Sequence, residues 1–253
     1  MESLIEREGR PATMPWEAPD VETSSEEYSC RFAGEVGTYF LAVQARTVRE
    51  LLSPWPGARV LEVGGGHAQL APALFERGFR VTITGSAEVC RRRLDRELPP
   101  GSFDFEVCDA ARLPFPDRSF DVVLAVRLLT HLERWREALG EMCRVAGRAV
   151  IVDYPDTRSF NRLYGPFFSW KRAVEENTRT FRSFRPEEVI AECARHGFGR
   201  PAVRRQFVLP MVAHRILGHA GLSRALEGLS GWAGLTRAFG SPVVLRVERL
   251  RGQ

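Results

Sequence analysis

The order of hydrophobic and polar residues along the 253-residue chain predicts short strands that alternate with amphipathic helices. Strands are expected near residues 59–63, 80–84, 103–108, 120–126 and 148–153, with helical stretches between them. The run from Val122 to Val126 is apolar without alternation, which is typical of a strand covered on both faces. This alternation predicts an α/β fold built on a parallel sheet.

A further helix and two further strands are expected after the fifth strand. The helix covers residues 185–198, because Pro186 suits its first turn and Gly197 its end. The strands cover residues 202–209 and 243–247.

The connection between these last two strands, residues 210–240, is unusually long and contains apolar side chains that could share a face. A helical hairpin that closes a pocket is the preferred interpretation, and a face for a membrane surface or a lipid acceptor is the alternative. His214 and His219 are five residues apart, which does not match metal ligands on a helix, so no metal is predicted. His214 is a candidate general base if this segment folds over the site.

The stretch from residue 60 to residue 70 reads as a strand, a glycine turn and the start of a helix over about 68–77. Gly64, Gly65 and Gly66 can take backbone angles that a Cβ would forbid, so a ligand can approach the main chain closely. The N–H groups at the start of the helix favour an anionic or acceptor-rich ligand. The alternative is a tight turn that only packs the strand on the helix.

A dinucleotide is disfavoured as the ligand of this turn. The NAD fingerprint needs a third glycine where this chain has Gln69, and an acidic residue about twenty positions further on, where it has Thr84. An ordinary nucleotide-dependent oxidoreductase is therefore the less favoured alternative.

The order Glu62, Gly64, Gly66 resembles motif I of the class I S-adenosylmethionine-dependent methyltransferases, with Ala68 where the last glycine usually stands. A second stretch, from Cys108 to Leu132, is similar to the same superfamily. It contains an Asp-Ala pair after a strand, a Leu-Pro-Phe-Pro turn, a Ser-Phe-Asp strand start and a His-Leu pair. The combination identifies the chain as a methyltransferase type 11-like member of that superfamily.

The resemblance implies a Rossmann-like, mostly parallel seven-stranded sheet flanked by helices, with the last strand antiparallel and a helical cap insertion. Residues 28–253 would form the methyltransferase domain, with a cofactor-binding half over 28–155 and an acceptor-binding half over 156–253. Residues 1–27 are polar, proline-bearing and acidic, and are expected to be mobile.

The cofactor implied is S-adenosyl-L-methionine. The residues expected to bind it are Glu62, Gly64, Gly65, Gly66, His67, Ser86, Asp109, Ala110 and Arg127. In relatives Asp109 and Ala110 would lie against the adenine. Most relatives also hold both ribose hydroxyls with an acid at the end of the second strand, where this chain has Thr84. Ser86 is expected to replace that acid, with Glu88 as an alternative.

The expected reaction is an in-line transfer of the sulfonium methyl group to an oxygen, nitrogen or carbon of an acceptor, and it depends mainly on positioning. The candidate catalytic residues are His131, Arg127, Lys171 and Tyr154. His131 has the side chain whose pKa suits a general base at neutral pH. Arg127 and Tyr154 follow the fourth and fifth strands, where ligands bind in open α/β sheets. Lys171 is the only lysine of the chain.

Residues 155–184 are rich in aromatic and basic side chains and are interpreted as a cap. Phe167, Phe168 and Trp170 could line an apolar acceptor pocket, next to basic residues that steer an anionic acceptor. Together with residues 210–240, this segment is expected to close over the cofactor.

The net charge of +4 does not point to a nucleic-acid partner, because basic and acidic residues are interspersed. Five scattered cysteines without a CxxC pair favour a reducing cytoplasm and no zinc. The sequence has no apolar run long enough to span a membrane and no signal peptide, so a cytoplasmic location is expected.

The partner is expected to be a small-molecule, sugar or lipid acceptor, whose identity the sequence leaves open, as it does the oligomeric state. The alternative function is a catalytically inactive protein that keeps the fold as a binding or scaffold module. Thr84, in place of the ribose-binding acid, motivates that alternative.

Overall fold

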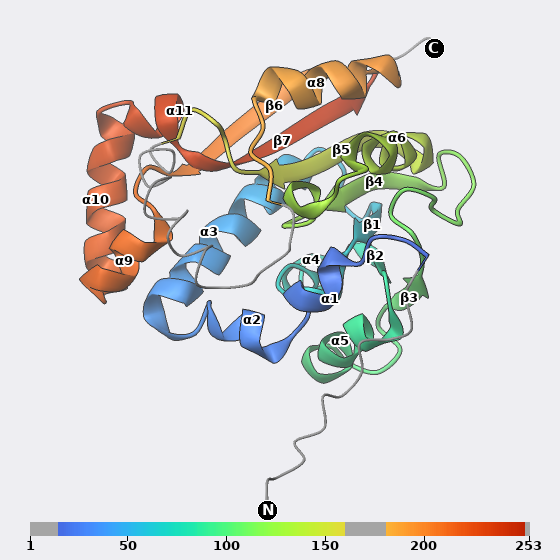
Figure 1. Cartoon of the computed structure of the whole chain (residues 1–253), viewed down its shortest axis with the longest axis horizontal. Coiled ribbons are helices and arrows are strands. Elements are labelled where there is room, and N and C mark those ends of the chain that lie inside the picture. Colours follow the sequence, from blue (N-terminus) through green and yellow to red (C-terminus); the bar gives the residue numbers. More distant parts are fainter. Residues whose placement is uncertain (1–14, 160–180, 251–253) are drawn as a thin grey trace, which may run out of the picture.

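The computed structural model describes residues 15–159 and 181–250, which build a single sheet flanked by helices (Figure 1). The strands are β1 (Arg59–Val63), β2 (Arg80–Gly85), β3 (Asp104–Val107), β4 (Phe120–Ala125), β5 (Ala146–Tyr154), β6 (Phe198–Phe207) and β7 (Ser241–Arg249). Their order across the sheet is β3-β2-β1-β4-β5-β7-β6. Strands β1 to β5 pair in parallel, and β7 runs antiparallel to both of its neighbours. The predicted seven-stranded Rossmann-like sheet, with its last strand antiparallel, is confirmed.

Helices cover both faces of the sheet (Figure 1). The first face packs on α3 (Gly34–Leu52), α4 (Ala71–Phe75) and α5 (Arg91–Glu97), and the second on α6 (Trp135–Val145) and α8 (Pro186–Arg195). In β4, Val122 and Leu124 belong to the core cluster of the first face and Val123 to that of the second. The strand is buried on both sides, which explains its unbroken apolar sequence.

The chain after β1 differs from the helix expected over residues 68–77. A single turn, η1 (Gly65–His67), follows the strand, and α4 begins only at Ala71. Gly64 and Ala68 have left-handed backbone angles, with φ of 70° and 54°, which a right-handed helix does not accommodate. The loop at the ligand site is therefore made of turns and not of the start of a long helix.

The described part of the N-terminal segment, residues 15–27, packs on the domain. It forms α1 (Pro19–Thr23) and the start of α2 (Glu26–Cys30). Asp20 is buried, and Glu17 accepts hydrogen bonds from the backbone N–H groups of Glu133 and Arg134 at 2.6 and 2.9 Å. The acidic side chains of this segment accept hydrogen bonds from main-chain N–H groups that are far away in sequence. The composition of the segment alone does not reveal these partners, so it suggests a solvated tail.

The segment between β6 and β7 is helical, as expected. It consists of α9 (Met211–Leu217), α10 (Ala220–Trp232) and α11 (Leu235–Phe239), which stand beside one end of the sheet (Figure 1). Among the residues that the structure describes, no helix has the length and apolar character needed to cross a membrane.

Candidate functional site

The site lies at the carboxyl ends of the parallel strands, where the strand order changes direction. From β1 the chain proceeds to β2 and β3 on one side, whereas β4 and β5 lie on the other side of β1. Ligands of open α/β sheets bind in the crevice at such a switch point. The residues that follow β1, β2, β4 and β5 therefore border this crevice.

The glycine turn after β1 is tightly enclosed. A Cβ on Gly66 would lie 2.3 Å from the Ser24 hydroxyl, and one on Gly64 would lie 2.9 Å from the Leu128 side chain. A Cβ on Gly65 would lie 2.7 Å from the side chain of Glu62. All three glycines are therefore steric requirements of this loop.

His67 fastens the loop to β4. Its Nε2 lies 3.3 Å from the Val126 carbonyl oxygen, and its Nδ1 accepts the backbone N–H of Gln69 at 3.1 Å. Burial lowers the pKa of His67 to about 3, so the ring is neutral and its proton sits on Nε2. The imidazole ring of His67 is thus directed into the protein. If His67 binds the cofactor, as the sequence predicts, it does so through its main chain.

Glu62 lies directly beneath the glycine loop and is fully buried. Within the described part of the chain, neither carboxylate oxygen has a hydrogen-bond partner, and Oε1 is 3.8 Å from Nε2 of His67. Burial raises the pKa of Glu62 to about 8, so the carboxyl group keeps its proton at neutral pH. A buried acid without a partner is a group that a ligand can satisfy.

The end of β2 has no acid of its own, but α1 brings one to it. Asp20 accepts the backbone N–H of Ser86 at 2.8 Å through Oδ2 and the Ser86 hydroxyl through Oδ1. The indole N–H of Trp16 donates to the Ser86 carbonyl oxygen at 3.2 Å. The Ser86 hydroxyl donates to Asp20, and the expectation that Ser86 meets the ligand stays a prediction. Sequence reasoning missed Asp20, which lies 64 residues before Thr84 in an acidic segment.

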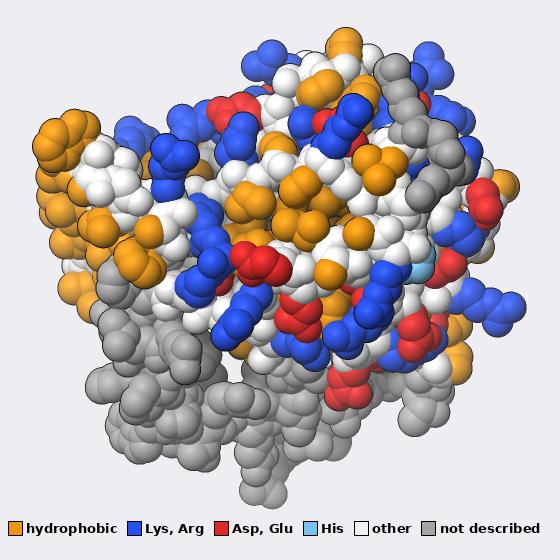
Figure 2. Space-filling model, turned by 90° about the horizontal axis from the view of Figure 1, so that it is seen from above, with side chains coloured by type: hydrophobic (Ala, Val, Ile, Leu, Met, Phe, Trp, Pro, Cys, Tyr) orange, Lys and Arg blue, Asp and Glu red, His pale blue; other side chains and the backbone are white. Residues whose placement is uncertain are grey.

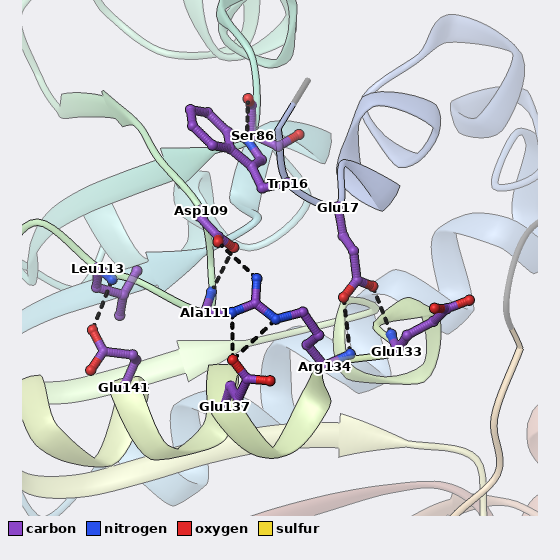
Figure 3. A network of polar contacts seen from close by, with 10 residues as sticks. All are labelled: Trp16, Glu17, Ser86, Asp109, Ala111, Leu113, Glu133, Arg134, Glu137 and Glu141. Atoms are coloured by element: carbon purple, nitrogen blue, oxygen red, sulfur yellow. Dashed lines mark hydrogen bonds and ion pairs between the residues drawn. The ribbon is translucent and has the colours of Figure 1, made fainter. Parts of the chain in front are cut away.

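Asp109 follows β3 on the same edge (Figure 3). Its Oδ1 accepts the backbone N–H of Ala111 at 2.9 Å, and its Oδ2 accepts from Nη1 of Arg134 at 3.2 Å. Arg134 is also tied to Glu17 through its backbone N–H, so residues 16 and 17 connect the β2 end to the start of α6. Figure 3 shows Trp16, Glu17, Asp109 and Arg134 close together in this polar network.

A cavity of about 280 Å³ lies beside this region, at the ends of β4 and β5. Aromatic side chains dominate its wall. Its lining residues are Tyr28, Phe32, Phe40, Gln44, Arg127, Thr130, His131, Asp153, Tyr154, Pro155, Phe181, Gln206, Phe207, Leu209, Pro210, Met211, Ser241 and Pro242. The rings of Phe40 and Phe207 stack with their centroids 4.0 Å apart.

A polar network lies in the wall of the cavity. Asp153 accepts the backbone N–H of Arg127 at 2.6 Å and the side-chain amide of Gln44 at 3.0 Å, and Gln44 in turn accepts from Nη2 of Arg127 at 2.8 Å. The guanidinium of Arg127 lies over the ring of Phe32, 4.0 Å from its centroid. Burial raises the pKa of Asp153 to about 6. The network fixes the direction of Arg127, whose buried Nη1 has no partner among the described residues.

The structure places three of the four predicted catalytic residues, Arg127, His131 and Tyr154, in this one cavity. The Tyr154 hydroxyl is buried without a partner in the described structure, and burial raises its pKa, so it is a neutral hydrogen-bond donor. His131 lies beside the ring of Phe181. Lys171, with Phe167, Phe168 and Trp170, lies outside the described residues.

His214 does not line the cavity. It is buried against the ring of Phe40, and its Nε2 lies 3.0 Å from the carboxylate of Glu227. Glu227 also accepts the backbone N–H groups of Val208 and Leu209. The pair holds α9 and α10 to the end of β6, so His214 has a structural role.

Comparison with known proteins identifies the cofactor half. Residues 61–150 match the family model described as a methyltransferase domain. This stretch of the chain is therefore similar to a methyltransferase domain. The match contains the glycine loop, Asp109 and β4, which the sequence motifs had singled out.

Two curated relatives show the range of this domain. The chain is 35% identical over 146 residues to the O-methyltransferase cnsE of Penicillium expansum, covering 54% of this chain and 49% of that protein. It is 34% identical over 128 residues to the ubiquinone/menaquinone biosynthesis C-methyltransferase UbiE of Xanthomonas oryzae, covering 46% and 50%. The chain thus spans about half the length of the curated relatives it matches.

Solved structures share the fold over most of the chain. A methyltransferase of Thermotoga maritima, described as a possible histamine N-methyltransferase, aligns with a TM-score of 0.62 at 20% identity, covering 88% of this chain and 95% of that one. The magnesium protoporphyrin IX methyltransferase of Synechocystis aligns with a TM-score of 0.58 at 14% identity, covering 89% and 94%.

The residues present fit S-adenosylmethionine. The cofactor carries an ammonium group and two ribose hydroxyls, which are hydrogen-bond donors. Glu62 offers a buried carboxyl group without a partner beneath a glycine loop, and Asp20 offers a carboxylate at the β2 end. A carboxylate has about four lone-pair sites, and Asp20 uses two of them for Ser86.

Proposed function

We propose that this protein is an S-adenosylmethionine-dependent methyltransferase of a small aromatic acceptor, such as a phenol or a hydroquinone. The observation that carries the proposal is the aromatic cavity at the ends of β4 and β5, next to the glycine loop. Its seven aromatic or imidazole side chains and its size suit a flat ring, and Arg127 and Tyr154 supply donors for the ring's oxygen atoms. The curated relatives, an O-methyltransferase and a quinone-biosynthesis C-methyltransferase, support it.

The cofactor site in this proposal runs along the glycine loop. Gly64, Gly65 and Gly66 leave room for the methionine part, and Asp109 and Ala110 flank the adenine. Asp20 holds the ribose hydroxyls in place of the acid that Thr84 replaces. When bound, the cofactor supplies an electrophilic methyl group on a sulfonium.

The contribution of the chain is positioning and proton handling. The aromatic wall excludes water and holds the acceptor ring flat, while Arg127 and Tyr154 orient its oxygen by hydrogen bonds. Charge from Arg127 also lowers the pKa of a phenol placed against it. His131, in the same wall, accepts the acceptor's proton.

The test is calorimetry followed by product analysis. Purified protein should bind S-adenosylhomocysteine with a micromolar dissociation constant, and a panel of phenols, hydroquinones, hexoses and fatty acids incubated with methyl-labelled cofactor should show label in the ring compounds. Failure to bind S-adenosylhomocysteine would refute the methyltransferase itself. Binding with label only in sugars or fatty acids would refute the aromatic acceptor.

A further inference from the structure

Helix α10 turns its apolar side away from the protein. Leu222, Leu229 and Trp232 are spaced by seven and three residues, which places them on one side of the helix. All three are exposed, Leu229 by 64% and Trp232 by 90%. The side that faces the domain carries the buried Ser223 and Glu227. This is the reverse of a helix that faces water, so the outer side of α10 is suited to contact with something apolar.

The neighbouring helices extend this surface. In α9, Val212 and Ile216 are four residues apart and exposed, Ile216 by 81%. In α11, Leu235 and Phe239 repeat the same spacing and are 39% and 38% exposed. Figure 2 shows hydrophobic side chains gathered at the left edge of the molecule, where Figure 1 places these helices. These seven residues define the α9–α11 surface. Clustered exposed apolar side chains of this size mark an interaction site.

The exposed charged residues of the helices that carry the α9–α11 surface are all arginines. Arg215, Arg224 and Arg237 are exposed. Glu227 is the only acid in residues 211–240, and it is buried, where it accepts backbone N–H groups. Two copies of this surface placed face to face would bring arginines together without a carboxylate from the surface to pair with them. A second copy of the chain is therefore a poor partner.

We propose that the α9–α11 surface docks on an anionic lipid membrane. Phosphate head groups supply negative charges that pair with the arginines, and the acyl boundary takes up the leucine, isoleucine and phenylalanine side chains. Trp232 suits this position because an indole ring places its apolar body at the acyl boundary and its N–H among the head groups. The protein lies on the bilayer without crossing it.

The docking surface adjoins the aromatic cavity. Leu209, Pro210 and Met211 line the cavity and lead directly into α9, whose Val212 and Ile216 belong to the surface. An acceptor dissolved in the membrane would therefore reach the cavity beside the bilayer. This last step rests on the proposed function, whereas the docking itself does not.

Co-sedimentation of the full-length protein with vesicles tests the proposal. Vesicles of phosphatidylglycerol and phosphatidylcholine in equal parts should carry the protein down at low salt, and pure phosphatidylcholine vesicles should not. Raising the salt from 50 to 500 mM should release most of it, because the arginine contribution is screened. Equal sedimentation with both lipids, or with neither, would overturn the proposal.

Two matched triple variants distinguish binding through the arginines of α9–α11 from attraction by the net charge of the protein. Replacing Arg215, Arg224 and Arg237 by Gln should weaken partition into the anionic vesicles about a hundredfold, since each basic residue near such a surface contributes about fivefold. The control replaces Arg77, Arg80 and Arg92, which are exposed at the other end of the molecule, and should bind like the wild type. Equal loss in both triple variants would show attraction by net charge alone.

Trp232→Ala tests the apolar component and the rival partner together. It should weaken vesicle binding about tenfold, with urea midpoint and S-adenosylhomocysteine affinity unchanged. Light scattering of the wild type should give a monomer without lipid. A dimer that Trp232→Ala dissociates would overturn the proposal and assign the surface to a second copy. Loss of S-adenosylhomocysteine binding in the wild type would refute the proposed function and leave the docking result standing.

Discussion

Two buried carboxyl groups, Asp20 and Glu62, lie at the proposed cofactor site. The resemblance to class I methyltransferases predicts an acid at the end of the second strand, whereas here Thr84 occupies that position and Asp20 arrives from α1. The buried Asp20 carboxylate receives two hydrogen bonds from Ser86, which hold it in place. Hydrogen bonds to a charged group are worth about 1.5–3 kcal/mol, so one residue can compensate for the substitution at Thr84.

We expect Asp20→Asn to weaken binding of S-adenosylhomocysteine at least tenfold, because a carboxamide accepts fewer hydrogen bonds from the ribose. Calorimetry measures the dissociation constant. Adding Thr84→Asp to the same variant should recover part of the affinity, which a merely structural role of Asp20 would not predict. Glu17→Gln, in the same segment but directed at α6, is the control and should stay within a few-fold of the wild type.

The buried pair Glu62 and His67 should shape the pH dependence of stability. Burial raises the pKa of Glu62 from 4.5 to about 8. Between these pH values the unfolded chain gives up its proton and the folded protein keeps it, so the free energy of unfolding falls as the pH rises, by on the order of a few kcal/mol. Burial lowers the pKa of His67 from 6.5 to about 3. Between these pH values the unfolded chain binds a proton that the folded protein does not, so the free energy of unfolding falls as the pH falls from 6.5 to 3.

Glu62→Gln should therefore flatten the decline in stability between pH 6.5 and 8, and His67→Gln should flatten it between pH 6.5 and 4. Urea unfolding followed by circular dichroism at half-unit steps of pH measures both. Parallel pH profiles for the wild type and Glu62→Gln would contradict the raised pKa.

At the scale of elements, the glycine loop and the N-terminal segment form one unit. Gly66 and Ser24 approach so closely that a methyl group on Gly66 would displace the Ser24 hydroxyl. Helix α1, which ends directly before Ser24, carries Asp20. The loop therefore constrains the position of Asp20, the acid proposed to bind the ribose, as well as its own shape.

Gly66→Ala should loosen residues 15–27 and lower both stability and cofactor affinity. Overpacking of this kind costs about 1–3 kcal/mol. Limited proteolysis should cut the variant within residues 15–27 faster than the wild type. Gly228→Ala, in α10 where nothing lies within 4 Å of the added Cβ, is the control and should leave affinity unchanged and raise stability slightly. Unaltered cleavage and affinity in Gly66→Ala would show that the two elements are independent.

At the scale of the whole molecule, the cavity brings together parts that are distant in sequence. Phe40 comes from α3, Arg127 follows β4, Tyr154 ends β5, and Phe207 ends β6. None of the seven strands could build this wall alone. The cofactor loop and the acceptor cavity share the strand edge but few residues, so binding and turnover should be separable by mutation.

Tyr154→Phe should leave the dissociation constant of S-adenosylhomocysteine unchanged and lower kcat/KM for the acceptor about tenfold, the worth of one hydrogen bond of about 1.4 kcal/mol. Calorimetry and methyl-transfer rates measure the two quantities. A matching loss of cofactor affinity would place Tyr154 at the cofactor and not at the acceptor.

The sequence by itself determined the sheet and the cofactor half. Continuous apolar runs such as Val122–Val126 reveal strands that are buried on both faces, and Gly64 meets a local need, the left-handed φ of 70° in the turn after β1. Asp109 follows its strand in the same local way. Such features depend on neighbours in the chain, so periodicity and spacing record them.

Only the tertiary structure decided the groups that depend on distant partners. Asp20 reads as part of a solvated acidic tail until Ser86, 66 residues away, is seen to donate to it. The network of Gln44, Arg127 and Asp153 and the outward apolar side of α10 are equally hidden, because each joins elements whose packing no local spacing encodes. Hydrogen bonds and burial over such sequence separations arise from the fold as a whole, and that is the physical reason why the site emerged only with it.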